Sequence, residues 1–146
     1  MIPLSKDKAS FMSSPLHFLK LWLVLGWLLI AVISILSLIP SLPTYQSTLD
    51  FLPNDIDKVG HVLAYFFLMG WFAQIYHLPK QRLWLVGNFV VLGLTLELLQ
   101  GLTGTRHPSL IDAFANNLGI LIAWIITKDH CQFLLITFEQ KYLLKS

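Results

Sequence analysis

The sequence predicts an all-α membrane protein: a four-transmembrane-helix bundle with both termini cytoplasmic and a short amphipathic C-terminal helix. Three observations predict it. Of the 146 residues, 55% are hydrophobic and 12% are charged, and the mean hydropathy of +0.67 is too high for an ordinary soluble domain. Apolar stretches long enough to cross a bilayer recur along the chain. The basic residues lie between alternate stretches, as they do in multi-pass proteins.

The small positive charge does not indicate a nucleic-acid partner. The formal net charge is +2, and membrane proteins commonly hold such an excess in their cytoplasmic loops. The single cysteine, Cys131, excludes an internal disulfide framework. It is expected to be a small apolar residue near the membrane surface.

The first apolar run extends from Leu21 to Ile39 without a charged residue and ends before Pro40. Its length of about 19 residues is enough for one crossing. The basic segment before it, residues 1–20, also fits a cleaved signal peptide, but the apolar core of such a peptide has only about 7 to 15 residues. We therefore expect a cytoplasmic N-terminal segment and an uncleaved first transmembrane helix.

Three further apolar runs follow an external loop at residues 40–56, which contains three prolines. The second run, Val59 to Tyr76, is short for a span, so its polar start must lie at the membrane interface. The third run is Leu83 to Leu99. The fourth, Leu110 to Thr127, follows a glycine-containing turn. Together the four runs define a membrane domain over residues 21–127.

The tail, residues 128–146, is expected to form an amphipathic helix that lies on the cytoplasmic surface of the membrane. Apolar residues recur in it at helical spacing: Cys131, Leu135, Phe138 and Tyr142. Charged residues occupy other positions, among them Glu139, Lys141 and Lys145.

The distribution of lysine and arginine predicts the orientation of the helices. Most basic residues fall in segments that share one side of the membrane: Lys6, Lys8, Lys20, Lys80, Arg82, Lys128, Lys141 and Lys145. The opposite side has only Lys58 and Arg106. The positive-inside rule therefore makes both termini cytoplasmic. Most of the tryptophans fall near the same predicted cytoplasmic boundary, where aromatic rings are favoured: Trp22, Trp71, Trp84 and Trp124.

Three of the predicted helices carry polar residues at the depth of the external boundary. These residues are Asp57, His61, Tyr65, Glu97, Gln100, Asp112 and Asn116. Within each helix they are three or four positions apart and so share one side of it. An ionisable group at such a depth costs about 2.5 to 3.5 kcal/mol and usually faces the bundle interior. We therefore expect one polar cluster between the three helices.

The residues around this cluster are suited to hold it together. Small residues that allow close helix packing are Gly93, Gly119 and Ala123. The glycine-containing turn is expected to hold Arg106 over the cluster, where its charge can neutralise a carboxylate. Ser109 is placed to cap the fourth helix, with Asp112 in its first turn, where a negative charge suits the helix dipole.

Most of these polar residues also have a purely structural interpretation. Interhelical hydrogen bonds, a solvated surface pair or interfacial packing would explain the following positions: Asn116, Asn117, Asp57, Lys58, His61 and Tyr65. Arg106 would in that case have no role beyond neutralising Glu97 or Asp112. Glu97 is the strongest functional candidate, because a carboxylate about four residues inside a span is too deep to be a solvated residue at the membrane surface.

The polar residues within residues 57–123 form an ordered set of motifs: Asp57-Lys58-x-x-His61-x-x-x-Tyr65, Gly93-x-x-x-Glu97-x-x-Gln100, Arg106 and Asp112-x-x-x-Asn116-x-x-Gly119. In their order and spacing, these motifs resemble those of the VanZ-like family of small bacterial membrane proteins. A Thr-Gly run precedes Arg106 where a proline is expected, and Ala123 stands where a second glycine often occurs. The resemblance implies a cell-envelope protein of the bacterial inner (cytoplasmic) membrane. The family's name member is associated with antibiotic resistance to teicoplanin, by a mechanism that is not established.

Two functions of different classes are compatible with these residues. The first is binding or processing of an anionic lipid or lipid-linked envelope precursor at the outer leaflet. Its candidate catalytic residues are Glu97, His61, Asp57 and Asp112, and its candidate binding residues are Lys58, Arg106, Tyr65, Gln100 and Asn116. The second is a non-enzymatic membrane module, in which the cluster is structural and the loops bind a partner.

For the first function, Lys58 and Arg106 would hold the phosphate, and His61 or Glu97 would transfer protons. Alternatively, a divalent cation would be collected by Asp57, His61, Glu97 and Asp112. The chain contains no H-E-x-x-H metal motif and no G-x-S-x-G nucleophile motif. Whether the protein is an enzyme is therefore left open by the sequence.

Overall fold

The computed structural model describes residues 16–39, 56–102, 109–129, 131 and 133–144. Its helices are, in chain order, α2 (Leu19–Leu38), α4 (Ile56–Ala73), α5 (Pro79–Leu102), α6 (Leu110–Asp129) and α7 (Leu134–Phe138), followed by the π-helical turn η1 (Glu139–Leu143). The described residues include no strand. The prediction of an all-α protein is therefore confirmed for this part of the chain.

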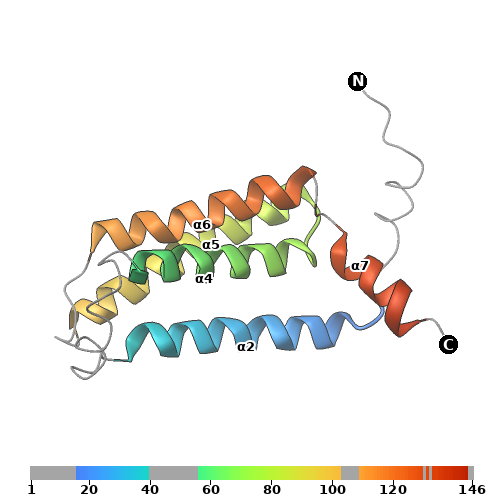
Figure 1. The fold of residues 1–146 in the computed structure, drawn as a ribbon, viewed down its shortest axis with the longest axis horizontal. Coiled ribbons are helices and arrows are strands. Elements are labelled where there is room, and N and C mark those ends of the chain that lie inside the picture. Colours follow the sequence, from blue (N-terminus) through green and yellow to red (C-terminus); the bar gives the residue numbers. More distant parts are fainter. Residues whose placement is uncertain (1–15, 40–55, 103–108, 130, 132, 145–146) are drawn as a thin grey trace.

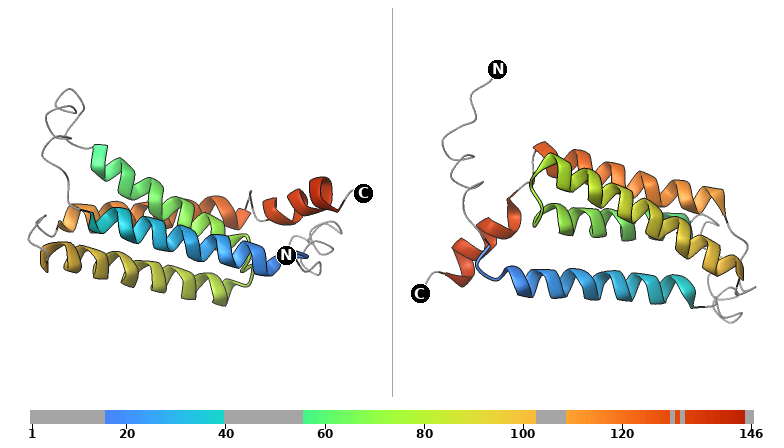
Figure 2. Two further views of the ribbon diagram at one scale, coloured as in Figure 1. Left: turned by 90° about the horizontal axis from the view of Figure 1, so that it is seen from below. Right: turned by 180° about the vertical axis from the view of Figure 1, so that it is seen from behind.

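The four long helices lie along the long axis of the molecule, and successive helices run in opposite directions (Figure 1). α4 contacts each of the other three, and α5 contacts both α2 and α6. α2 and α6 lie on opposite sides of α4 and α5 (Figures 1 and 2). α7 and η1 lie at the end of the bundle where α2 begins (Figure 1). The opposite end carries the first turns of α4 and α6 and the last turns of α5.

The four long helices follow the predicted apolar runs, with ends that differ by at most four residues. α2 and α6 match their runs to within two residues at each end. α5 begins at Pro79, because the missing N–H of a proline is no loss at the first helical position. α4 begins three residues before the predicted run and ends at Ala73 rather than near Tyr76.

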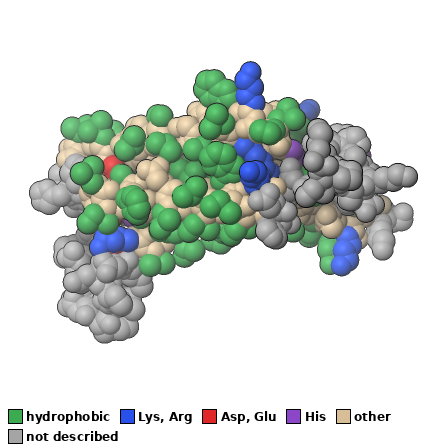
Figure 3. Space-filling view, turned by 90° about the horizontal axis from the view of Figure 1, so that it is seen from above, with side chains coloured by type: hydrophobic (Ala, Val, Ile, Leu, Met, Phe, Trp, Pro, Cys, Tyr) green, Lys and Arg blue, Asp and Glu red, His purple; other side chains and the backbone are tan. Residues whose placement is uncertain are grey.

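Three of the helices are long and apolar enough to cross a membrane: Leu19–Leu38, Pro79–Leu102 and Leu110–Lys128, with mean hydropathies of 2.6, 1.6 and 1.6. Their apolar side chains are largely on the outside of the molecule. In α2, only Trp22 and Gly26 are buried. Hydrophobic side chains cover most of the described surface that Figure 3 shows. These features fit a multi-pass membrane protein.

α4 is not one of those three helices, since its first turns contain Asp57, Lys58 and His61. It instead supplies most of the buried core: Tyr65, Leu68, Met69, Phe72 and Ala73. Because α2, α5 and α6 all contact it, much of its surface faces protein. A helix sheltered in this way needs less hydrophobicity than a helix that faces lipid on all sides.

Small residues allow α4 and α6 to approach each other closely, as the sequence predicts. A Cβ atom added to Gly119 of α6 would lie only 2.2 Å from the carbonyl oxygen of Val62 on α4. Ala123, one turn further along α6, has no exposed surface. The backbones of the two helices are therefore in direct contact.

The tail packs differently from the amphipathic pattern of its sequence. Its buried residues are Ile136 and Glu139, whereas Phe138 and Tyr142 of the predicted apolar side are 44% and 62% exposed. The Glu139 carboxylate accepts hydrogen bonds from the backbone N–H groups of His17, at 2.7 Å, and Phe18, at 2.9 Å, and from the indole N–H of Trp22. Glu139 thus joins the tail to the start of α2.

Two further buried polar side chains hold this end of the bundle together. Gln74 donates to the carbonyl of Cys131 and accepts the N–H of Leu134, at 2.8 Å, so it links α4 to the tail. Arg82 donates to the carbonyl oxygens of Ala73, at 3.0 Å, and Tyr76, at 3.3 Å. Arg82 therefore caps the end of α4 and does not merely add charge to a loop.

Candidate functional site

The candidate site consists of two layers of side chains between α4, α5 and α6, at the end of the bundle away from the tail. The outer layer contains His61, Glu97 and Asp112, one from each helix. The inner layer contains Tyr65, Gly93 and Asn116. Each inner residue is four positions from the outer residue on its own helix, toward the middle of the bundle. Residues four apart lie on one side of a helix, so the sequence spacing produces both layers.

The outer layer brings two carboxylates and an imidazole together. One ligand atom from each of His61, Glu97 and Asp112 lies within 4.8 Å of the other two. His61 Nε2 is 4.0 Å from Asp112 Oδ2, which is beyond direct hydrogen-bonding distance. Glu97 and Asp112 are 6% and 7% exposed. The three side chains therefore form a small, enclosed cluster that contains two carboxylates and one imidazole.

The first turn of α6 partly stabilises this negative charge. The N–H of Asp112 donates to Ser109 Oγ at 3.2 Å, so the predicted cap by Ser109 is confirmed. The N–H of Ser109 itself donates to Glu97 Oε2 at 3.3 Å. Both carboxylates thus lie at the N-terminal end of α6, where the helix dipole favours a negative charge.

In the inner layer, Asn116 positions the histidine. His61 Nδ1 lies 3.0 Å from Asn116 Oδ1. Since the amide oxygen can only accept, Nδ1 carries the proton, and the lone pair of a neutral ring is on Nε2. Nε2 is the nitrogen that lies toward Asp112.

The Tyr65 hydroxyl group lies beside Asn116 in the inner layer. Tyr65 is 2% exposed, and its hydroxyl group has no hydrogen-bond partner among the described residues. A Cβ on Gly93 would lie 3.2 Å from this hydroxyl and 3.2 Å from Asn116 Nδ2. Gly93 thus leaves room for both polar groups.

A cavity of about 270 Å³ adjoins the site between α2 and α4. Its lining includes Asp57, His61 and Tyr65 from α4, and Ile33, Leu36 and Ser37 from α2. One wall of the cavity is therefore polar and the other mainly apolar. His61 and Tyr65 line both the cavity and the site, so the cavity is a route by which a ligand can reach them.

Some residues that the sequence placed in the cluster lie elsewhere. Gln100 is buried but donates to the carbonyl oxygen and hydroxyl of Ser37, at 2.6 and 2.8 Å, so it joins α5 to α2. Asn117 is exposed, and its side chain donates to the carbonyl oxygen of Ala113 on its own helix, at 2.9 Å. Ser37 was missed, although a serine in so apolar a run was a usable signal.

The remaining predicted residues lie at the edge of the site or outside the described chain. Asp57 is exposed at the cavity, and its carboxylate accepts the N–H of the half-buried Lys58 at 2.8 Å. Arg106 lies outside the described residues, as do the loop at residues 40–55 and the glycine turn at residues 103–108. The predicted position of Arg106 over the cluster therefore stays a prediction.

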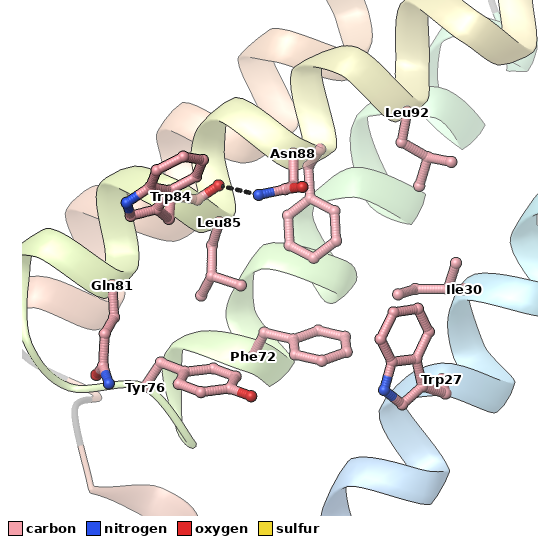
Figure 4. Close-up of a pocket in the computed structure, with 10 residues that line it drawn as sticks. Trp27, Ile30, Phe72, Tyr76, Gln81, Trp84, Leu85, Asn88 and Leu92 are labelled. Carbon is pink, nitrogen blue, oxygen red and sulfur yellow. Dashed lines mark hydrogen bonds between the residues drawn. The ribbon is translucent and has the colours of Figure 1, made fainter.

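A second cavity, of about 520 Å³, opens between α2, α4 and α5 and is lined mainly by aromatic and aliphatic side chains (Figure 4). Trp27 and Ile30 of α2 face Phe72 of α4 and Tyr76, which follows α4, and Asn88 of α5 donates to the Trp84 carbonyl at 2.7 Å. The described residues that line the cavity include no carboxylate, histidine or basic group. This cavity can hold an apolar chain, but it offers no groups for acid–base or metal chemistry.

Comparisons with known proteins give no further assignment. Neither the models of protein families, the curated proteins nor the solved structures match this chain.

Proposed function

We propose that this protein is a VanZ-like integral protein of the bacterial inner membrane that binds an anionic lipid or lipid-linked envelope precursor at the outer leaflet. In this proposal all four long helices cross the membrane, with both termini in the cytoplasm. α4 is the central helix, shielded from lipid by the other three. The tail then lies at the cytoplasmic surface, and the His61–Glu97–Asp112 site lies near the external surface.

The observation that carries the proposal is the juxtaposition of this polar site with a cavity that has an apolar wall. A lipid has an anionic headgroup and apolar chains, and so needs both surfaces in one place. The cavity wall formed by Ile33 and Leu36 suits the start of an acyl or polyprenyl chain. His61 lies on the opposite wall, at the headgroup end, and Lys58 and Arg106 remain the proposed partners of the anionic group.

The orientation can be tested by cysteine labelling in intact cells. In a Cys131→Ser background, we expect an impermeant maleimide to label Asn54→Cys and Thr105→Cys, which lie in the two connections assigned to the outside. Gln81→Cys, at the start of α5, should react only after the cells are opened. Labelling in the reverse pattern would move the site to the cytoplasmic leaflet and would contradict binding at the outer leaflet.

Ligand binding can be tested with two adjacent asparagines. Asn116→Ala removes the hydrogen bond that orients His61, whereas Asn117→Ala changes an exposed side chain outside the site. We expect wild type and Asn117→Ala to retain the same lipid or precursor after purification, and Asn116→Ala to retain clearly less, as measured by mass spectrometry. Equal retention by the two variants, at equal amounts of folded protein, would show that the lipid or precursor does not bind at this site.

A specific set of contacts favours one alternative function, a non-enzymatic membrane module with loops that bind a partner. Gln100 joins α5 to α2, His61 and Asn116 join α4 to α6, and Glu97 joins α5 to the start of α6. These bonds would fix the helix packing without any ligand. In that case Glu97→Gln would lower the amount of folded protein and any envelope phenotype in parallel, and the lipid profile at matched protein level would equal that of wild type.

A further inference from the structure

We propose that His61 Nε2 and the carboxylates of Glu97 and Asp112 bind one divalent transition-metal cation of the zinc or manganese type. The three residues come from three different helices and converge within 4.8 Å. Ligand atoms around a cation at about 2.1 Å are themselves about 3 to 3.5 Å apart. Small rotations of the three side chains would therefore close the site around an ion.

The charge of the site favours a cation over an empty cluster. Glu97 and Asp112 are buried residues, and their carboxylates lie within a few ångströms of each other. Burial of like charges is costly unless a counter-charge accompanies them. A divalent cation would balance the two carboxylates and leave the loaded site neutral. The partial charge at the start of α6 contributes in the same direction but does not amount to two charges.

The histidine is arranged as a ligand rather than as the partner of an ion pair. Its Nδ1–H is directed to Asn116 Oδ1, which leaves the Nε2 lone pair toward the carboxylates. The 4.0 Å between Nε2 and Asp112 Oδ2 is too long for a hydrogen bond, and the two atoms need to approach by less than about 1 Å to share an ion. Metal-binding histidines typically donate the other ring N–H in this way, which fixes the tautomer and the ring orientation.

The environment of the Tyr65 hydroxyl group independently indicates a ligand. The hydroxyl is buried and lacks a hydrogen-bond partner among the described residues, which is unusual for a polar group. It lies in the layer directly beneath the three ligands, beside Asn116. From there the hydroxyl is placed to bond a water molecule or ligand oxygen in the coordination sphere of the ion.

The ligand set indicates which cation and which ligand the site would take. One imidazole with two carboxylates suits zinc or manganese, whereas calcium and magnesium prefer oxygen ligands alone. Three protein ligands leave at least one coordination position open, and the adjoining cavity shares His61 and Tyr65 with the site. That this position receives a phosphate oxygen of a lipid rests on the proposed function, whereas the cation site itself does not.

The test is metal binding by the full-length protein in detergent, purified with an affinity tag that contains no histidine and stripped with a chelator. We expect wild type to bind about one equivalent of Zn²⁺ or Mn²⁺ in equilibrium dialysis, and Ca²⁺ at least tenfold more weakly. Glu97→Gln and Asp112→Asn should weaken binding at least 100-fold. Asn116→Ala, which removes no ligand, should weaken it about 10- to 100-fold. The matched control is Glu139→Gln, which removes a buried carboxylate at the other end of the bundle and should leave affinity unchanged.

Wild type that binds less than about a tenth of an equivalent, or that prefers Ca²⁺, would overturn the metal site. So would equal affinity in wild type, Glu97→Gln and Asp112→Asn. If the ligand variants do not fold, Co²⁺ added to wild type still decides. A four- or five-coordinate site with histidine and carboxylate ligands gives visible d–d bands much more intense than those of Co²⁺ in water, and a spectrum equal to that of free Co²⁺ would overturn the site. Lipid retention is measured separately: metal without lipid refutes the proposed function alone, and lipid without metal refutes this site alone.

Discussion

Replacing Gly119 by alanine is expected to destabilise the protein by about 3 kcal/mol or more, at or above the upper end of what overpacking usually costs. The added methyl carbon would lie 2.2 Å from the carbonyl oxygen of Val62 and 3.0 Å from the N–H nitrogen of Phe66. Both atoms belong to the backbone of α4, so no side-chain rotation can relieve the contact. α4 and α6, which form the closest pair in the bundle, must therefore separate.

The chain offers matched controls for this prediction. A Cβ on Gly87 of α5 or Gly70 of α4 would meet nothing within 4 Å. Alanine is a better helix former than glycine, so these variants should be neutral or more stable by up to about 1 kcal/mol. The melting temperature and folded yield in detergent measure the difference. A Gly119→Ala protein as stable as Gly87→Ala would contradict the close contact.

Separation of α4 and α6 should also disturb the candidate site. Gly119 lies three residues after Asn116, and Val62 directly follows His61. The contact that sets the distance between these helices therefore also sets the distance from His61 to Asp112 and Asn116. The close packing at Gly119 and the geometry of the site therefore depend on each other.

The position of the cluster could be predicted from the sequence because it depends on regular geometry. Antiparallel helices of similar length bring residues near their shared end to one depth, at about 1.5 Å per residue. His61, Glu97 and Asp112 are all near that end of their helices. The spacing of four residues placed Tyr65 and Asn116 on the same side of their helices as His61 and Asp112, but the division of the cluster into two layers was not predicted.

The direction of individual side chains could not be predicted in the same way. Gln100 is three residues after Glu97, a spacing that also permits contact with a different neighbouring helix. Which helix it contacts depends on where α2 packs, and the apolar surface of α2 has little pattern to reveal this. Likewise, Asn116 and Asn117 are identical in type, and only the packing of α6 determines that one is buried and the other exposed.

No local pattern in the sequence predicted the contacts of the tail. Glu139 bonds to His17 and Phe18, which are 122 and 121 positions earlier in the chain. A glutamate in a short amphipathic pattern is normally solvated, and the spacing of Leu135, Phe138 and Tyr142 indicated a different apolar side. A tertiary hydrogen-bond network at the start of α2 overrides that pattern.

Glu139→Gln is expected to release the tail from the bundle. The carboxylate accepts all three hydrogen bonds that the structure gives at this point, whereas an amide presents an NH₂ group to some of the same donors. Hydrogen bonds to a charged group contribute about 1.5 to 3 kcal/mol each, so docking should weaken by on the order of 3 kcal/mol. Proteolysis at Lys141 measures the release, and Gln140→Ala, at an exposed neighbouring position, is the control. Equal cleavage of the two variants would contradict the role of the carboxylate.

The same contact makes the tail sensitive to acid, with a defined direction. Burial alone would raise the pKa of Glu139, but the hydrogen bonds from Trp22, Phe18 and His17, with the charge of His17, together lower the pKa below its usual value. The docking that the carboxylate provides is then fully present above the ordinary glutamate pKa of about 4.3 and is lost as the pH falls through the lower folded value. The indole N–H resonance of Trp22, assigned with Trp22→Phe, should move in one step with a midpoint below 4.3. A midpoint above that value would mean that burial, and not the three donors, dominates at Glu139.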